Sequence, residues 1–267
     1  MLASKTLGCA VAAPPDPAWD ISNLVFLQSA TLGASFTQDL FIKPDGLKLY
    51  NTRGFFGDGT VFELNLSTAW NITTASAFQS INVVTNSASV RGLFFKPDGT
   101  KMYTTSVASS SVVEYTLSTA WNVSTATYIQ SFSVSSQDST PSSLTFKPDG
   151  TKMFVLGRNN NRVYEYTLST AWNISTASYV QFTGGGLEPE GLTFKPDGTK
   201  MYTTGTSGGD IRQYNLSTAW NISTATLIQT VSVAAQTDRP HGVVFKDDGL
   251  KCYICSRSGV FYEYDLV

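Results

Sequence analysis

One phrase of nine residues recurs along this chain and constrains its fold more than any other feature. It stands as FKPDGTKMY at 95–103 and 194–202, as FKPDGTKMF at 146–154, and in looser forms at 41–50 and 245–253. The lysine before the turn falls at 43, 96, 147, 195 and 246, a spacing of 48 to 53 residues. Repeats of this length are typical of propellers and solenoids, so we expect one repetitive domain.

A second phrase, LSTAW, keeps the same spacing. The chain has five tryptophans, and all but the first belong to this phrase: Trp19, Trp70, Trp121, Trp172 and Trp220. Within one unit, 189–233, the stretches GLTFK, KMYTT, IRQYNL and TLIQTVSV combine β-branched and aromatic residues with period-two alternation, which favours strands. The PDG between the first two is typical of a tight hairpin turn. Four strands per unit in five units predict an all-β, five-bladed β-propeller with four antiparallel strands per blade.

The two ends of the chain predict how the ring closes. WDISNLVFLQSATL at 19–32 matches WNISTATLIQTVSV at 220–233 position by position, yet it precedes the first PDG phrase. The chain stops at FYEYDLV, one strand short of a full unit. We therefore expect the N-terminal strand to complete the last blade and leave no incomplete sheet, with residues 18–267 forming the propeller.

Residues 1–17 fall outside the repeats, and we expect them to form an N-terminal docking arm. Its apolar side chains Leu2, Leu7 and Val11 are the candidate contacts with a partner. A secretion signal is the alternative, but the segment has a single lysine and a short apolar stretch, which are weak features for that role.

Composition excludes several classes of function. Charged residues make up 14% of the chain and the net charge is -2, so the basic excess of a nucleic-acid binder is missing. The apolar runs are too short for membrane insertion. Cys252 and Cys255 form a CxxC, but an odd separation within a strand points the two thiols to opposite faces. We expect no metal site and no cofactor.

The loops divide the predicted disc into two faces. The face with the PDG turns and the STAWN segments is nearly identical in every unit, and we call it the constant face. The opposite, variable face carries loops that differ in every unit, and their candidate ligand-binding residues are Arg53, Phe55, Phe56, Arg158, Asn160, Asp210 and Arg239. Variety on a rigid frame is typical of a binding surface, although tolerated drift in exposed loops would give the same pattern.

One matched position sharpens this pattern. The residue that begins each inner strand next to the variable face is polar and different in every unit: Gln38, Arg91, Ser142, Glu190 and His241. We expect these five side chains to converge at the mouth of the central channel and to bind a ligand. His241 is the only histidine and could do acid–base work with Glu190, but no nucleophile motif accompanies it, so binding is favoured over catalysis.

The repeat text resembles known families. PDG followed by an apolar strand resembles YVTN and NHL-type blades, and the tandem of STAWNIST and FKPDGTKMY resembles repeats in marine bacteriophage structural proteins and related bacterial surface proteins. The resemblance covers residues 18–267 and implies no catalytic residues. It implies a non-enzymatic virion protein, decorating the capsid or associated with the tail, which is located on the virion surface or is extracellular.

In this interpretation the arm docks to a capsid or tail protein, and the variable face recognises a host-surface glycan or protein. A lectin-like glycan-binding module is the alternative function. A glycoside-active enzyme comes third, because it would need two carboxylates at a defined separation. Such a pair could come from the acids that have no counterpart in the other units, Asp39, Glu188, Glu190, Asp210 and Asp238, but the sequence does not fix their distances.

Overall fold

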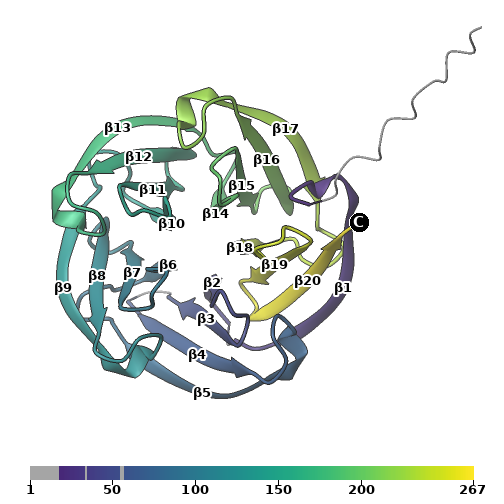
Figure 1. Cartoon of the computed structure of the whole chain (residues 1–267), viewed down its shortest axis with the longest axis horizontal. Coiled ribbons are helices and arrows are strands. Elements are labelled where there is room, and N and C mark those ends of the chain that lie inside the picture. The colour runs from purple at the N-terminus through teal and green to yellow at the C-terminus, as the bar shows by residue number, and fades with distance from the viewer. Residues whose placement is uncertain (1–17, 34, 55–56) are drawn as a thin grey trace, which may run out of the picture.

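The computed structural model describes residues 18–33, 35–54 and 57–267, and these form a five-bladed β-propeller (Figure 1). Blade 1 contains β2 (Thr37–Ile42), β3 (Lys48–Arg53), β4 (Thr60–Leu66) and β5 (Ala75–Asn82). Blade 2 contains β6 (Val90–Phe95), β7 (Lys101–Ser106), β8 (Ser111–Leu117) and β9 (Ala126–Ser133). Blade 3 contains β10 (Pro141–Phe146), β11 (Lys152–Gly157), β12 (Arg162–Leu168) and β13 (Ala177–Gly184). Blade 4 contains β14 (Pro189–Phe194), β15 (Lys200–Gly205), β16 (Asp210–Leu216) and β17 (Ala225–Ser232).

The fifth blade closes the ring as the sequence predicts. Its strands are β18 (Pro240–Phe245), β19 (Lys251–Ser256), β20 (Val260–Leu266) and, from the other end of the chain, β1 (Leu24–Thr31). β1 runs antiparallel to β20 in a register that pairs Leu24 with Leu266 and Thr31 with Val260. The purple and yellow strands at the right of Figure 1 are this pair. Both termini of the propeller are thereby held in one sheet.

The PDG phrase forms the hairpin between the first two strands of each blade, and the tryptophan of the same blade covers it. In blade 2 Gly99 has φ +73°, and a Cβ there would lie 2.4 Å from the indole of Trp121. The Trp121 backbone N–H also donates to the Gly99 carbonyl over 3.0 Å. Glycine is therefore required at this turn both for its backbone conformation and for the room that the indole takes.

The segment after each tryptophan is a short 3-10 helix, an element that the sequence analysis treated as a plain connection. The five helices of the described residues are η1 (Ile21–Asn23), η2 (Ile72–Thr74), η3 (Val123–Thr125), η4 (Ile174–Thr176) and η5 (Ile222–Thr224). Asn122 caps η3 by accepting the N–H of Ser124, and Asn71 caps η2 in the same way. None of these helices is long or apolar enough to cross a membrane.

The repeated phrases also bind each blade to the next, because their side chains meet across the blade boundary. Glu114 accepts hydrogen bonds from Lys101 and from Gln130 (2.8 Å) in its own blade, and from the backbone N–H of Ile174 (3.3 Å) in blade 3. The hydroxyl of Tyr103 donates to the Trp172 carbonyl, also in blade 3, over 2.7 Å. The repeated glutamate therefore has a structural role, which is to join one blade to the next.

The inner strands β2, β6, β10, β14 and β18 surround the central axis (Figure 1). The end of this channel at the variable face is called the mouth below, and the end at the constant face is called the funnel. The apolar core lies between adjacent blades: one cluster, for example, joins Tyr50 and Val61 of blade 1 to Leu93, Phe95 and Met102 of blade 2. The scaffold between the two ends is therefore rigid and close to five-fold repetitive.

Candidate functional site at the variable-face mouth

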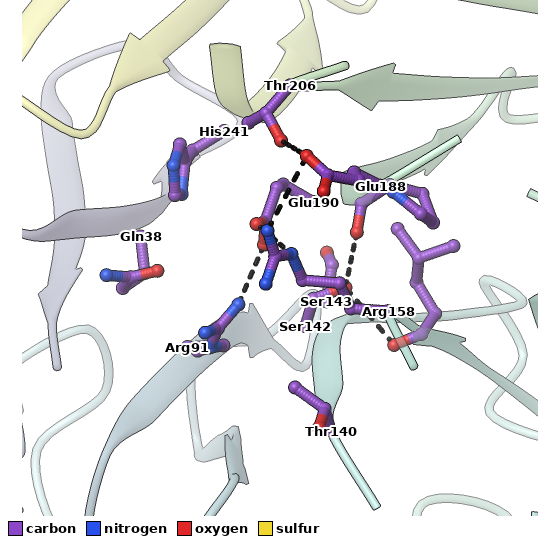
Figure 2. Close-up of polar contacts among 12 residues, drawn as sticks. Gln38, Arg91, Thr140, Ser142, Ser143, Arg158, Glu188, Glu190, Thr206 and His241 are labelled. Carbon is purple, nitrogen blue, oxygen red and sulfur yellow. Dashed lines mark hydrogen bonds and ion pairs between the residues drawn. The ribbon is translucent and has the colours of Figure 1, made fainter. Parts of the chain in front are cut away.

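The matched polar residues occupy the second position of each inner strand, and four of them point toward one space at the mouth. Figure 2 shows Gln38, Arg91, Glu190 and His241 around this space, each on a different blade. Because the inner strands run alongside one another around the axis, residues up to about 200 positions apart in sequence become neighbours here. The side chains are enclosed: Gln38, Glu190 and His241 are each only 4% exposed.

Glu190, on blade 4, contacts arginines of two other blades at the mouth. Its Oε2 accepts from Nη1 of Arg91 over 2.9 Å, and its Oε1 lies 2.6 Å from Nε of Arg158 (Figure 2). Burial raises the pKa of Glu190, and the two guanidinium groups act against that rise. Burial also lowers the pKa of Arg91, to which the charges of Arg158 and Arg257 contribute. The buried carboxyl group of Glu190 therefore lies between the guanidinium groups of two arginines.

His241 is a neutral imidazole in this surrounding. Burial first, and then the positive charges of Arg91, Arg257, Arg158 and Arg239, together lower its pKa from 6.5 to about 3. Its Nδ1 is buried and accepts no hydrogen bond from any described residue. An imidazole of this kind can accept a proton or a hydrogen bond from a molecule that enters the mouth.

Gln38 and Ser142 are the other two matched residues, and they differ in whether a polar atom is left without a hydrogen-bond partner. The Nε2 of Gln38 donates to the carbonyls of Phe36 and Gly54, both over 3.1 Å, while its Oε1 is buried with no partner among the described residues. The Oγ of Ser142 donates to the carbonyls of Leu156 (3.3 Å) and Pro189 (3.1 Å). Ser142 thus holds blades 3 and 4 together, and Gln38 offers an acceptor to the mouth.

Two of the variable-loop candidates join the mouth. Arg158 does so through Glu190 and lies 3.8 Å from Glu188, whose carboxylate also accepts from Thr206 over 2.9 Å. Arg239 contributes its charge to the surroundings of His241. A polar cavity of about 280 Å³ opens beside the mouth, lined by Thr140, Arg158, Asn159, Asn161 and Glu188.

The remaining candidates lie elsewhere. Arg53 forms an ion pair with Asp58 (2.8 Å), and the Nδ2 of Asn160 donates to the carbonyl of Gln137 over 2.7 Å. Asp210 is paired with Arg212 over 2.9 Å and is buried at the start of β16 rather than in a loop. Five candidates lie outside the described residues: Phe55, Phe56 and the arm residues Leu2, Leu7 and Val11.

The described residues contain no group of three or more His, Cys, Asp or Glu side chains that could hold a metal ion. Cys252 and Cys255 are both buried as free thiols, and burial raises the pKa of each.

Asp39, which the sequence offered only as one of several unmatched acids for a carboxylate pair, adjoins Gln38 on β2 and is 4% exposed. It occupies the position that holds Gly92, Ser143, Gly191 and Gly242 in the other blades. In the sequence, the only indication of its importance was a charged residue at a position where the other blades have small residues. Its significance could be judged only once the five strands were arranged around one axis.

Comparisons with known proteins identify the fold and correct the expected function. No protein-family model matches the sequence, and no curated protein does. The periplasmic gluconolactonase of Pseudomonas aeruginosa has a similar structure, with a TM-score of 0.53 at 16% identity over 81% of this chain and 64% of that one. A proposed 6-phosphogluconolactonase of Bacteroides uniformis gives a TM-score of 0.52 at 16% identity over 86% and 66%. The chain thus spans just under two thirds of the length of each neighbour.

At these identities the likeness shows the propeller fold and nothing finer. The neighbours nevertheless carry the names of lactonases, which contradicts our expectation of a non-enzymatic virion structural protein. The exclusion of enzyme activity was wrong for the same reason. The resemblance to phage repeats and to YVTN or NHL-type families is borne out only as far as the five-bladed propeller.

Proposed function

We propose that this protein is a hydrolase that opens a small sugar lactone at the variable-face mouth. The observation that carries the proposal is the unpartnered Nδ1 of a neutral, buried His241 in a space shared with the guanidinium group of Arg91 (Figure 2). Titratable groups whose pKa values are shifted by burial and by specific charges mark many active sites. The names of the two lactonase neighbours supply the substrate class to test first.

The charges favour a substrate that is itself negative. Arg91, Arg158, Arg239 and Arg257 act on the mouth, while Glu190 and Glu188 are the acidic groups among them. An anionic substituent on the sugar would offset the excess of positive charge. It would also raise the pKa of His241 toward neutrality, because the arginines are part of the reason that this pKa is low. Substrate binding would thereby improve the imidazole as a base.

In the proposed reaction, Nδ1 of His241 takes a proton from a water molecule as the water oxygen bonds to the lactone carbonyl carbon. Arg91 and Arg158 stabilise the negative charge that develops on the carbonyl oxygen. The bond between the carbonyl carbon and the ring oxygen then breaks, and the imidazolium returns its proton to that oxygen. The product is an open hydroxy acid, which loses its proton at neutral pH. Glu190 orients both arginines, and Oε1 of Gln38 accepts a hydrogen bond from a sugar hydroxyl.

The test compares hydrolysis of δ-gluconolactone and its 6-phospho form by titration of the released acid, with the spontaneous rate subtracted. We expect acceleration of both and a higher kcat/KM for the phosphorylated lactone. His241→Asn should lower kcat by about two to four orders of magnitude, the usual contribution of general acid–base catalysis. Lys195→Ala, in a turn of the constant face, is the matched control and should retain activity. If neither lactone reacts faster than its spontaneous rate, the proposal is wrong.

A further inference from the structure

The opposite end of the channel, the funnel at the constant face, contains a second cavity. Its volume is about 210 Å³. Each blade contributes the apolar end of its inner strand and the residue after the turn lysine, and three blades add an indole. The aromatic and proline lining residues are Trp19, Phe41, Pro44, Trp70, Phe94, Pro97, Phe146, Pro148, Phe194, Pro196, Trp220 and Phe245. This cavity is separate from the cluster at the mouth.

Two carboxylates interrupt this apolar lining. Asp39 lies where the other blades have glycine or serine, and Asp247 lies where they have proline. They are the only ionisable side chains among the described residues that line the funnel. Among the residues that line the funnel, the two departures from the repeat that introduce a charge are therefore both acidic.

The side chain of Asp39 is held in place by the channel wall. Its Oδ1 accepts from the backbone N–H of Leu40 (2.9 Å), and its Oδ2 accepts from the N–H of Leu93 and the Oγ of Ser143, both over 3.1 Å. The fourth side of the group is Gly242, where a Cβ would lie 2.2 Å from Oδ1. The small residues of the neighbouring blades therefore leave room for this one carboxylate at the base of the funnel.

Neither carboxylate forms an ion pair with a described residue. The nearby turn lysines are paired with the turn aspartates instead: Lys43 with Asp45 and Lys246 with Asp248, each over 2.6 Å. A negative charge in a mostly apolar cavity is costly unless a cation accompanies it. Aromatic faces also attract cations, most strongly when the cation is shielded from water. Charge and lining together favour a positive ligand with an apolar body.

We propose that the funnel binds an organic ammonium ion, with the ammonium group at Asp39 and the aliphatic chain along the aromatic and proline wall. A second ammonium group on the same molecule would meet Asp247 at the rim. An anion is disfavoured by both carboxylates. A bare metal ion is disfavoured because the described residues provide no cluster of three or more acidic, histidine or cysteine ligands.

The test is isothermal titration calorimetry of the full chain with n-butylammonium chloride at pH 8, above the pKa of about 7 to which burial raises Asp39, beside 1-butanol and sodium butyrate. We expect saturable binding of the ammonium ion alone. Asp39→Asn should weaken it by about ten- to a hundred-fold, the loss expected when a hydrogen bond to a charged group is removed. Equal binding of 1-butanol, or unchanged binding by the Asp39→Asn variant, would overturn the proposal.

A second variant guards against a loss that comes from misfolding. Thr193→Phe fills the funnel with a side chain that Phe41 and Phe94 already place at the matched position, and it touches neither carboxylate. It should abolish binding while leaving the unfolding transition intact. Asp58→Asn, in a loop of the variable face away from the mouth, should bind n-butylammonium as the parent does. Binding that persists in Thr193→Phe would show that the ligand sits elsewhere.

The rim carboxylate has its own readout. 1,5-Diaminopentane should bind more tightly than n-butylammonium to the parent, and Asp247→Pro, which restores the turn of the other blades, should remove that advantage without affecting n-butylammonium. If the diamine gains nothing over the monoamine, Asp247 has no part in the site.

Discussion

Replacing Asp39 with asparagine should change how the stability of the propeller depends on pH. Burial raises the pKa of Asp39 from 3.8 to about 7, and the charge of Glu190 adds to the rise, although three hydrogen bonds to the carboxylate oppose it. Asparagine has nearly the same shape and does not titrate. The difference in unfolding free energy between the two proteins therefore reports on the protonation of this one carboxyl group at the base of the funnel.

The sign and size follow from linkage. The pKa is higher in the folded state, so between pH 3.8 and about 7 the folded protein holds a proton that the unfolded chain has lost. The stabilising contribution is complete below pH 3.8 and is lost as the pH rises through 7. One pKa unit corresponds to about 1.4 kcal/mol, so roughly 4 kcal/mol of unfolding free energy should disappear across this window.

His241 acts in the opposite direction and must be separated. Its pKa falls from 6.5 to about 3, so between these values the unfolded chain binds the extra proton and stability rises with pH. In the parent the two slopes largely cancel where the windows overlap. Subtracting the Asp39→Asn profile from the parent profile removes the histidine contribution. The same subtraction with His241→Asn should give a difference of opposite slope.

The assay is urea unfolding followed by tryptophan fluorescence at several pH values between 4 and 8. Each of the five blades contains one tryptophan, so the signal reports on the whole ring. The unfolding free energy of the parent, relative to Asp39→Asn, should fall steadily from low to high pH. A difference that stays constant across this range would refute the assignment of a proton to buried Asp39 and would mean that the carboxylate is ionised throughout.

Two further predictions concern the scaffold. Glu114→Ala should destabilise the protein by about 3–5 kcal/mol in urea unfolding, because it leaves Lys101 without its buried partner. Glu114→Gln should cost much less, since Gln213 already fills the same position in blade 4, and equal losses for the two variants would contradict this. Deleting residues 1–32 removes β1 and exposes the edge of β20, so the truncated chain should self-associate in size-exclusion chromatography and melt earlier. A truncation that stayed monomeric and as heat-stable as the parent would argue against closure by β1.

The function expected from the sequence failed where it depended on the repeated text. FKPDGTKMY and LSTAW are scaffold: the indole of Trp121 covers Gly99 at the turn, and the hydroxyl of Tyr103 donates to the Trp172 carbonyl of the next blade. A resemblance that rests on such residues is evidence for the fold and not for the function. The residues to which we assign the proposed function are those where the repeats differ, and they form no motif in the sequence.

Local patterns in the chain determined the number of blades, the hairpin at each PDG and the closure by 19–32, because period-two alternation and turn chemistry act over a few residues. The sequence also singled out one ring of matched residues: Gln38, Arg91, Ser142, Glu190 and His241. It could not determine the ion pairs of Glu190, the free Nδ1 of His241 or the burial of Asp39. These arise from distances across the axis between strands of different blades, and only the closed ring sets those distances.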